Sequence, residues 1–463
     1  MDSKRRMEYR FEHGTSCNGA AFCGRQGAFP PRPGNMKGKV SPPGGDGGYR
    51  REFAVLAFMI VATFAASFAN YLFNIIAARL LGKEDYGVLA SLLSIFIVFS
   101  VPTTAIQAEV AKRVALHRAQ DDPRGVHGVI SGFFLFLALA GLVVFLSFCA
   151  LSRPLAGFLK MTTPLPLMVL GSAVALSSIY PVALGTLQGH QLFGHLGANM
   201  IFQATVRIGL GVLLIKAGWG VSGAMGASTV GLAAAMALAL AQGRAVLEGI
   251  RDAARIRLRD FLPGLLPVLA LVTMFWSFTS LDILIARRVL DAAAAGDYAC
   301  AVFMGKIVLF LPSAVSMVMF PKTAELHARG QGTTSTLFRY LSVGLLLSGA
   351  AGACYLLFPR FLINLLYGSE FQGAASVLGI FGMAMALYSA VNILLLYFIS
   401  VQFLRLPLLM TLATLALEIT VMGAFARSLA QFAWSHMALS ASLFTGLLWA
   451  TAAARRSGGA SRV

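Results

Sequence analysis

The stretch from Phe53 to Ala78 reads FAVLAFMIVATFAASFANYLFNIIAA, which is 26 consecutive residues without Lys, Arg, Asp or Glu. An α-helix rises about 1.5 Å per residue and the hydrocarbon core of a bilayer is about 30 Å thick, so this stretch is long enough to cross a membrane. Stretches of the same kind recur along the chain as far as Ala454. The sequence therefore predicts an all-α integral membrane protein with several spans.

The composition agrees with this class. Hydrophobic residues make up 57% and charged residues 12% of the 463 positions, whereas soluble proteins carry about 25% charged residues. The net charge of +18 does not indicate a nucleic-acid partner, because the basic residues lie mainly in tails and short loops, where they set membrane topology. The five cysteines show no CxxC or Cys/His spacing, so we expect neither a metal site nor a disulfide framework.

Hydropathy predicts about twelve membrane spans. Polar turns separate them, such as the run QGHQ at residues 188–191 between the fourth and fifth spans. An even number of spans places both termini on the same side of the membrane. The predicted spans lie near residues 53–77, 86–107, 126–150, 164–185, 197–216, 219–242, 261–285, 298–320, 337–358, 372–399, 405–426 and 430–452.

The spans fall into two sets of six. Residues 1–50 are rich in Pro and Gly and predict a disordered basic tail. Residues 51–243 form the predicted N-lobe and residues 261–454 the predicted C-lobe. Between them, residues 244–260 carry three arginines at helical spacing and predict an amphipathic helix on the cytoplasmic membrane surface. Residues 455–463 form a short second tail.

Lys and Arg residues are distributed unevenly between the two sides of the membrane. With the N-terminus in the cytoplasm, 26 of them fall in cytoplasmic segments and 9 on the opposite side. Without the N-terminal tail the numbers are 16 and 9. The positive-inside rule therefore predicts that both termini are cytoplasmic.

The two sets of spans resemble each other in sequence. Residues 76–87, IAARLLGKEDYG, follow the first span, and residues 285–299, IARRVLDAAAAGDYA, follow the seventh. Pro102 in the second span has a counterpart in Pro312 in the eighth. The sequence thus predicts two six-helix lobes that are parallel repeats around a central cavity, which is the layout of a transporter.

Two basic residues, Arg207 and Lys306, lie inside predicted spans, where charged side chains face a cavity or a partner. Asn199, Gln203 and Arg207 occur at i, i+4 and i+8 and form one polar stripe. We expect Arg207 and Lys306 to line a cationic cavity for an anionic headgroup, because Arg can donate two parallel hydrogen bonds to phosphate and Lys offers a compact charge. Alternatively, Arg207 pairs with Glu418, or Lys306 extends to the nearer membrane surface.

Further polar residues lie in or beside the spans. Asn70 and Asn74 share one face of the first span and can bind sugar hydroxyls, although holding helices together is the favoured interpretation. Asp282 aligns with Asn74 in the repeat and either takes part in ion coupling or, as we favour, pairs with Arg287. Glu109 is favoured as a salt-bridge residue at the cytoplasmic end of the second span. The candidate coupling or gating residues are Asp282, Glu109 and Glu418.

Motifs of common enzyme classes do not occur in the sequence. It has no HExxH metalloprotease motif, no GxSxG nucleophile elbow and no Walker A loop. The longest loops between spans have about twenty residues, which is short for the catalytic loop of a membrane-embedded glycosyltransferase or polymerase. The sequence therefore predicts a protein that is not an enzyme and that uses no cofactor and no metal.

The run RLLGKEDYG at residues 79–87 resembles the polysaccharide biosynthesis (oligosaccharide flippase) family of the multidrug/oligosaccharidyl-lipid/polysaccharide exporter superfamily. LQGHQLF at residues 187–193 and LYGSEF at residues 366–371 match pieces of the same family in the same order. The resemblance extends over residues 50–455, which is nearly the whole membrane part.

The resemblance implies a transporter that flips a lipid-linked oligosaccharide, usually on undecaprenyl pyrophosphate, across the bacterial inner membrane for surface polysaccharide synthesis. The implied partners are this oligosaccharide and membrane lipids, with a polysaccharide polymerase and glycosyltransferases as further candidates. The alternative is a drug or cation antiporter of the same superfamily, which would favour buried carboxylates over buried Lys and Arg. The resemblance does not indicate which sugar or coupling ion is used.

Overall fold

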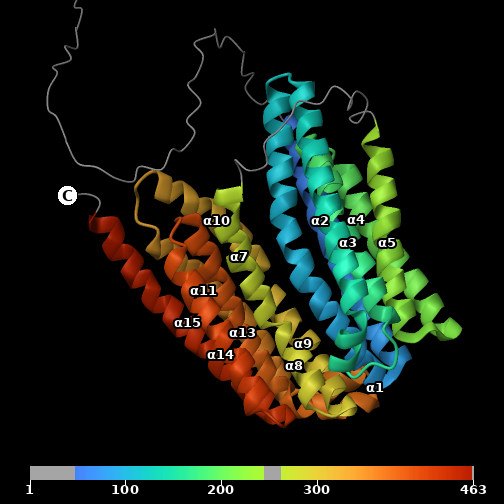
Figure 1. Ribbon diagram of the computed structural model, residues 1–463. Coiled ribbons are helices and arrows are strands. Elements are labelled where there is room, and N and C mark those ends of the chain that lie inside the picture. Colours follow the sequence, from blue (N-terminus) through green and yellow to red (C-terminus); the bar gives the residue numbers. More distant parts are fainter. Residues whose placement is uncertain (1–46, 245–261, 461–463) are drawn as a thin grey trace, which may run out of the picture. The chain divides into compact units, whose positions relative to one another are not determined.

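The computed structural model describes residues 47–244 and 262–460 (Figure 1). The predicted N-terminal tail and the predicted amphipathic helix lie outside these ranges, except for residues 47–50 and 244. In the described ranges the chain forms helices and turns and contains no strand. The predicted all-α class is confirmed.

The first half of the chain is built from long helices. α1 covers two predicted spans, and the backbone of Gly82, with a non-helical φ of 76°, forms a kink between them. This positive φ suits glycine because it has no Cβ. The elements are α1 (Gly47–Ala119), α2 (Pro123–Phe158), α3 (Leu165–Gly189), α4 (Phe193–Leu214), η1 (Ile215–Trp219) and α5 (Gly220–Gln242).

The second half contains more breaks. The predicted eighth span, residues 298–320, ends early because the helix is interrupted at Leu311 and Pro312, and proline lacks the N–H that continues a helix. The elements are α7 (Leu262–Phe278), α8 (Leu281–Val289), α9 (Ala292–Phe310), α10 (Ser313–Ala328), α11 (Thr334–Leu357), α12 (Pro359–Leu366), η4 (Ser369–Phe371), α13 (Gln372–Ser400), α14 (Arg405–Ala424) and α15 (Leu429–Ala460).

Among the described residues, nine helical stretches are long and apolar enough to cross a membrane. Two of them, Val61–Ala119 and Phe193–Gln242, have 59 and 50 residues, and each contains two predicted spans. α15 occupies the place of the last predicted span but is not among the nine. The chain is therefore a multi-span membrane protein.

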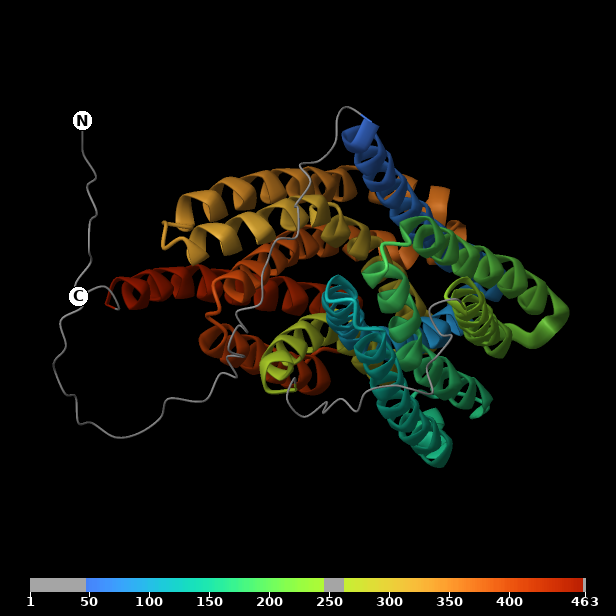
Figure 2. The same ribbon diagram turned by 90° about the horizontal axis from the view of Figure 1, so that it is seen from above.

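The helices gather into two lobes. In the first half α2 packs on α3, and α5 packs on both α3 and α4. In the second half α13 contacts α9, α11 and α15. Figure 2 shows the helices α2–α5 (cyan to green) in one group and most second-half helices (orange to red) in another. About 78% of the most apolar stretch of α13 is buried, against 22% for α14, so α13 lies at the core of the second lobe.

The two lobes contact each other through the repeated motifs. Lys83 of the first copy forms an ion pair with Asp297 of the second, with Nζ and Oδ2 2.7 Å apart. The backbones of Gly87 and Gly296 lie so close that a Cβ on Gly87 would be 3.2 Å from the Gly296 nitrogen. Small residues permit such an approach between helices. The contact thus depends on the glycines as well as on the ion pair.

Two arginines make the same kind of contact, each reaching from its own lobe to backbone carbonyls of the other lobe. Arg79, after the first span of the N-lobe, donates to the carbonyls of Leu365 and Leu366 at 2.6 and 2.9 Å. Arg287, at the end of the first span of the C-lobe, donates from Nε to the carbonyl of Leu159 at 3.1 Å. Each acceptor lies between the third and fourth span of the other lobe. This exchange agrees with a parallel repeat.

Candidate functional site

Arg207 of α4 is half-buried against the first span of the N-lobe. It donates from Nη1 to Oδ1 of Asn70 at 2.7 Å, and its guanidinium carbon lies 4.3 Å from the ring centroid of Phe73. Asn70 donates in turn to the carbonyl of Ala66 at 2.9 Å, which fixes the orientation of its amide. The Nε of Arg207 is buried without a hydrogen-bond partner. One donor of the guanidinium is therefore unpaired.

This environment decides between two predictions for Arg207. Its neighbours come from α1, whereas Glu418 lies in α14 beside His436 of α15. The predicted alternative, a pair between Arg207 and Glu418, is therefore wrong. Because the partner of Arg207 is a neutral amide, the positive charge is not cancelled.

The other residues of the predicted polar stripe have different surroundings. Asn199 is fully buried, accepts a hydrogen bond from Tyr180 and donates to the carbonyl of Ala235 at 2.9 Å. Its amide therefore joins α3, α4 and α5. Gln203, one turn before Arg207, is half-buried. Asn74 donates to the carbonyl of Asn70 at 2.9 Å, as expected for a polar residue within a packed span.

The C-lobe contains a sealed cluster of ionisable side chains. Asp282 of α8 accepts a hydrogen bond from the hydroxyl of Tyr298 at 3.0 Å. His436 lies between two carboxyl groups, with its Nδ1 3.8 Å from Asp282 and 3.7 Å from Glu418. All four side chains are 0% exposed. Neither oxygen of Glu418 and neither ring nitrogen of His436 has a hydrogen-bond partner.

Lys306 of α9 belongs to the same cluster. It is 5% exposed, and its ammonium lies 4.8 Å from the ring centroid of Phe303 without a hydrogen-bond partner. Its ammonium forms no ion pair with Asp282, but the two groups lie near enough for their charges to act on each other. The predicted alternative, that Lys306 extends to the surface, is wrong because the side chain is almost completely buried.

The two basic sites flank one contact between the lobes. The hydroxyl of Tyr71 donates to Sδ of Met304 at 3.2 Å. Tyr71 follows Asn70, the partner of Arg207, and Met304 precedes Lys306 by two residues. Arg207 and Lys306 thus belong to opposite lobes and lie near the same interface.

The observed contacts of Glu109 and Asp282 test two further predictions. Glu109 forms the predicted local ion pair, with Oε1 2.6 Å from Nη2 of Arg113. Asp282 does not pair with Arg287 as favoured, because it accepts from Tyr298 while Arg287 donates to carbonyls of the other lobe. Asp282 therefore remains a candidate for coupling.

Sequence reasoning missed His436 and Tyr298. His436 lies in the last predicted span, and the rule that singled out Lys306, that polar residues inside a span are costly, applies to it equally. Tyr298 was noticed only as part of the repeated motif. Their contact with Asp282 depends on the packing of α8 against α9 and α14 and of α15 against α14, which no local spacing reveals.

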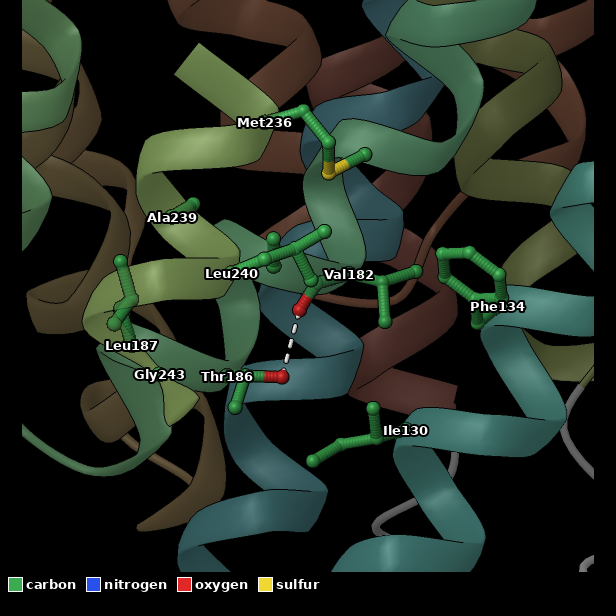
Figure 3. Close-up of a pocket in the computed structure, with 10 residues that line it drawn as sticks. Ile130, Phe134, Val182, Thr186, Leu187, Met236, Ala239, Leu240 and Gly243 are labelled. Carbon is green, nitrogen blue, oxygen red and sulfur yellow. Dashed lines mark hydrogen bonds between the residues drawn. The ribbon is translucent and has the colours of Figure 1, made fainter. Parts of the chain in front are cut away.

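Two hollows in the described part of the chain can be compared with the predicted cavity. One lies within the N-lobe between α2, α3 and α5 and is lined mainly by apolar side chains such as Phe134, Val182 and Leu240 (Figure 3). Its hydroxyl-bearing residue, Thr186, donates to the carbonyl of Val182 at 2.7 Å, so the hydroxyl is already used. The second hollow is polar and lies beside the contact between the lobes. Neither is lined by Arg207 or Lys306.

Solved structures with the same fold are transporters. A multidrug resistance MATE family transporter of the MOP superfamily in an inward-facing conformation matches with a TM-score of 0.74 at 14% identity, covering 85% of this chain and 95% of that one. The lipid II flippase MurJ in an inward closed conformation matches with a TM-score of 0.64 at 12% identity, covering 85% and 87%. A MOP superfamily transporter from Pyrococcus furiosus matches with a TM-score of 0.58 at 15% identity, covering 85% and 94%.

The sequence itself gives one family match. No curated protein matches the chain. The family described as "Polysaccharide biosynthesis protein" matches residues 76–376, a range that includes Arg207, Lys306 and the repeated motifs that join the lobes. This range is more than half of the chain. The chain therefore belongs to the polysaccharide biosynthesis protein family.

Proposed function

We propose that the protein flips a lipid-linked oligosaccharide, carried on undecaprenyl pyrophosphate, across the bacterial inner membrane by alternating access, for surface polysaccharide synthesis. The observation that carries this proposal is the half-buried Arg207, which keeps its charge and a free donor beside the interface of the two lobes. A pyrophosphate is an anion with several acceptor oxygens, and a guanidinium suits it in charge and in geometry.

The sugar part of such a cargo explains why a polar route is needed. Sugar hydroxyls lose their hydrogen bonds to water on entering hydrocarbon, and each unpaired hydroxyl costs several kcal/mol. Polar side chains between the lobes replace water during passage, while the lipid tail stays in the bilayer. Arg207 would hold the headgroup, and Asn70 and Gln203 lie close enough to Arg207 in the fold to contact the first sugar. Lys306 would act through the sealed cluster of the C-lobe.

The contacts between the lobes indicate which state the structure represents. If both termini are cytoplasmic, the turns that hold Lys83, Asp297, Arg79 and Arg287 lie at the outer end of the spans. The lobes are then joined at the outer end. This is a state that receives cargo from the cytoplasmic side, and the ion pair of Lys83 with Asp297 must break before release.

The sealed cluster of the C-lobe is proposed as the coupling site. With both carboxylates and Lys306 charged and His436 neutral, Asp282, Glu418 and Lys306 together carry one excess negative charge. An uncompensated buried charge is costly, so uptake of one proton makes the cluster neutral and stabilises the state in which it is sealed. Glu418, whose oxygens have no hydrogen-bond partner, is the proposed acceptor.

Surface polysaccharide production tests the cargo proposal. Arg207→Ala should lower it by about tenfold or more, because the change removes a charge-assisted contact of roughly 1.5–3 kcal/mol. Lys306→Ala should also lower it, because the change disrupts the coupling cluster. Arg153→Ala, at an exposed arginine of α2, is the matched control and should leave production unchanged. Membrane insertion of all three variants is checked by immunoblotting. Full production in the double variant Arg207→Ala/Lys306→Ala would exclude the cationic site.

A drug or cation antiporter remains the second candidate, and one observation favours it. Asp282 and Glu418 are buried carboxyl groups, which is the feature expected of a site for a cationic drug. Expression in a drug-sensitive host distinguishes the two functions. The flippase proposal predicts no change in resistance to cationic drugs, whereas resistance that depends on Glu418 would support the antiporter.

A further inference from the structure

A polar hollow with a volume of about 370 Å³ lies at the closed contact between the lobes. This volume is in the range of small-molecule sites, which is about 300–1,000 Å³. Its walls come from both lobes: Glu84, Asp85, Lys160, Thr162 and Trp219 belong to the N-lobe, and Arg287 belongs to the C-lobe. The residues proposed to hold the cargo and to couple transport do not line it.

Arg287 lines the hollow from the C-lobe and is held in place by carbonyls of the N-lobe. The residue is only 5% exposed, and it uses Nε and Nη2 to donate to the carbonyls of Leu159 and Lys160 at 3.1 and 3.5 Å. Its Nη1 is buried without a partner. This donor has no accessible surface, so Arg287 contributes its positive charge to the hollow and no free hydrogen-bond donor.

The charges that line the hollow indicate the class of ligand. Two carboxylates, of Glu84 and Asp85, are balanced by two cations, of Lys160 and Arg287. A lining without net charge gives no advantage to an anion or a cation. It offers donors and acceptors in similar number, which suits the hydroxyl groups of an uncharged ligand, since each hydroxyl both donates and accepts.

Hydroxyl and aromatic side chains complete the lining. Thr162, Thr163 and Ser222 add hydroxyl groups. Trp219 is 63% exposed and offers a flat apolar face with an N–H at its edge. A pyranose ring has an apolar face of C–H groups and a rim of hydroxyls, so it matches an indole beside such groups.

We propose that this hollow binds a neutral saccharide and that the bound saccharide holds the two lobes together at their closed end. The second part follows because Arg287 and Trp219 lie on opposite lobes, and a ligand that contacts both stabilises only the state in which they are close. The inference rests on the proposed function, in which sugars leave the protein at this end. Released product would then slow further transport.

Tryptophan fluorescence tests the site directly. The purified full chain with Trp276→Phe, Trp434→Phe and Trp449→Phe retains Trp219 as its single tryptophan. We expect maltotriose or triacetylchitotriose to change its emission in a saturable way and to raise the melting temperature. Glucuronic acid, an anionic sugar, should bind more weakly than the neutral sugars.

Two variants test whether saccharide binding depends on the residues that line the hollow. In the chain that keeps all its tryptophans, Trp219→Ala should weaken binding about tenfold, as measured by the saccharide-induced shift in melting temperature. The double change Thr162→Val/Thr163→Val, at two exposed residues, should also weaken it. Trp434→Ala, at an equally exposed tryptophan of α15 (60%), is the matched control and should bind as the parent does. A saccharide response that persists unchanged in Trp219→Ala, or no response to either neutral sugar, would overturn the proposal.

The outcome of this binding experiment can be distinguished from a failure of the proposed transport function. Saccharide binding that depends on Trp219 supports the hollow as a site even if Arg207→Ala leaves polysaccharide production intact. Tighter binding of glucuronic acid than of the neutral sugars would contradict the charge argument and overturn the proposed ligand class.

Discussion

The ionisable residues of the two lobes are placed in opposite ways. In the N-lobe, Arg207 is half-buried, has a neutral partner in Asn70 and keeps a free donor. In the C-lobe, Asp282, Lys306 and Glu418 are sealed among themselves. A charge that stays uncompensated and accessible can attract an ion of opposite sign, whereas a sealed set of mixed charges responds to a proton. We therefore propose that one lobe of the repeat serves the cargo and the other serves coupling.

Neutralising Asp282 should produce the largest effect on stability. With Glu418 protonated, as proposed for the sealed state, Asp282→Asn leaves the ammonium of Lys306 as the single charge of the cluster, which costs about 3–5 kcal/mol. The double change Asp282→Asn/Lys306→Met should recover most of that loss, because both charges are then removed. Thermal unfolding in detergent measures each variant. Equal stability of the single and double variants would mean that the two charges are not coupled.

Removing the charge of Arg207 in the N-lobe should lower the free energy of unfolding by less. Arg207→Met removes one charge-assisted hydrogen bond to Asn70, worth about 1.5–3 kcal/mol, but leaves no buried charge behind. The same unfolding assay applies, with Arg153→Met as the control. A loss as large as that of Asp282→Asn would show that Arg207 is a structural residue of the N-lobe and would remove the contrast between the lobes.

The contact between the lobes can be weakened by a substitution that lies outside both the Arg207 site and the sealed cluster. A Cβ on Gly296 would clash with the carbonyl of Lys83, so Gly296→Ala should shift the protein towards separation of the lobes at this end. Cys300 is 0% exposed here and lies in α9, four residues after Gly296.

Maleimide labelling of Cys300 measures that separation in a chain whose other cysteines are replaced by serine. We expect labelling about tenfold faster in Gly296→Ala, which corresponds to a shift of about 1.4 kcal/mol. Gly349→Ala, where a Cβ meets open space, is the control. Unchanged labelling in Gly296→Ala would mean that the lobes do not separate at this contact.

The smallest effect is expected at two helix starts that are alike in both lobes. The Oδ1 of Asp122 accepts from the N–H of Gly125 at 2.9 Å, and the Oδ1 of Asp291 accepts from that of Ala294 at 2.8 Å. The hydrogen bond from Gly125, followed by that from His117, lowers the pKa of Asp122. Its stabilising contribution is thus complete above the ordinary Asp pKa of about 3.9 and is lost as the pH falls through the lowered pKa.

Hydrogen exchange at the starts of α2 and α9 checks this expectation. Asp122→Ala and Asp291→Ala should each accelerate exchange at the start of their own helix only. Lowering the pH should remove the protection at Gly125 in the parent chain but have no such effect in Asp122→Ala, after correction for the intrinsic rate. If either substitution also accelerated exchange around Arg207 or the sealed cluster, the starts of α2 and α9 would not be independent of these two sites.

The sequence was sufficient to predict the class and the repeat, because both depend on residues close together in the chain. Runs of apolar residues define spans, and the motifs at 76–87 and 285–299 are visible without a structure. The break between the first two spans was predicted as well, because the kink of α1 at Gly82 lies between residues 77 and 86.

The ionisable residues inside the spans could be identified from the sequence, but their partners on other helices could not. Arg207, Lys306, Asp282 and Glu418 were all identified as costly residues inside spans. Their partners depend on which helices pack together: α4 against α1 for Arg207, and α14 against α8 and α15 for Glu418. The expected pair of Asp282 with Arg287 failed because Arg287 reaches carbonyls of the other lobe.

Transport in proteoliposomes tests the division of labour between the lobes most directly. Purified protein is reconstituted with a fluorescent undecaprenyl-pyrophosphate oligosaccharide, and its movement between leaflets is followed with and without a pH gradient. The account predicts that Arg207→Gln abolishes movement under both conditions, whereas Glu418→Gln retains movement but loses its response to the gradient. Gradient-stimulated movement in Glu418→Gln, or normal movement in Arg207→Gln, would contradict it.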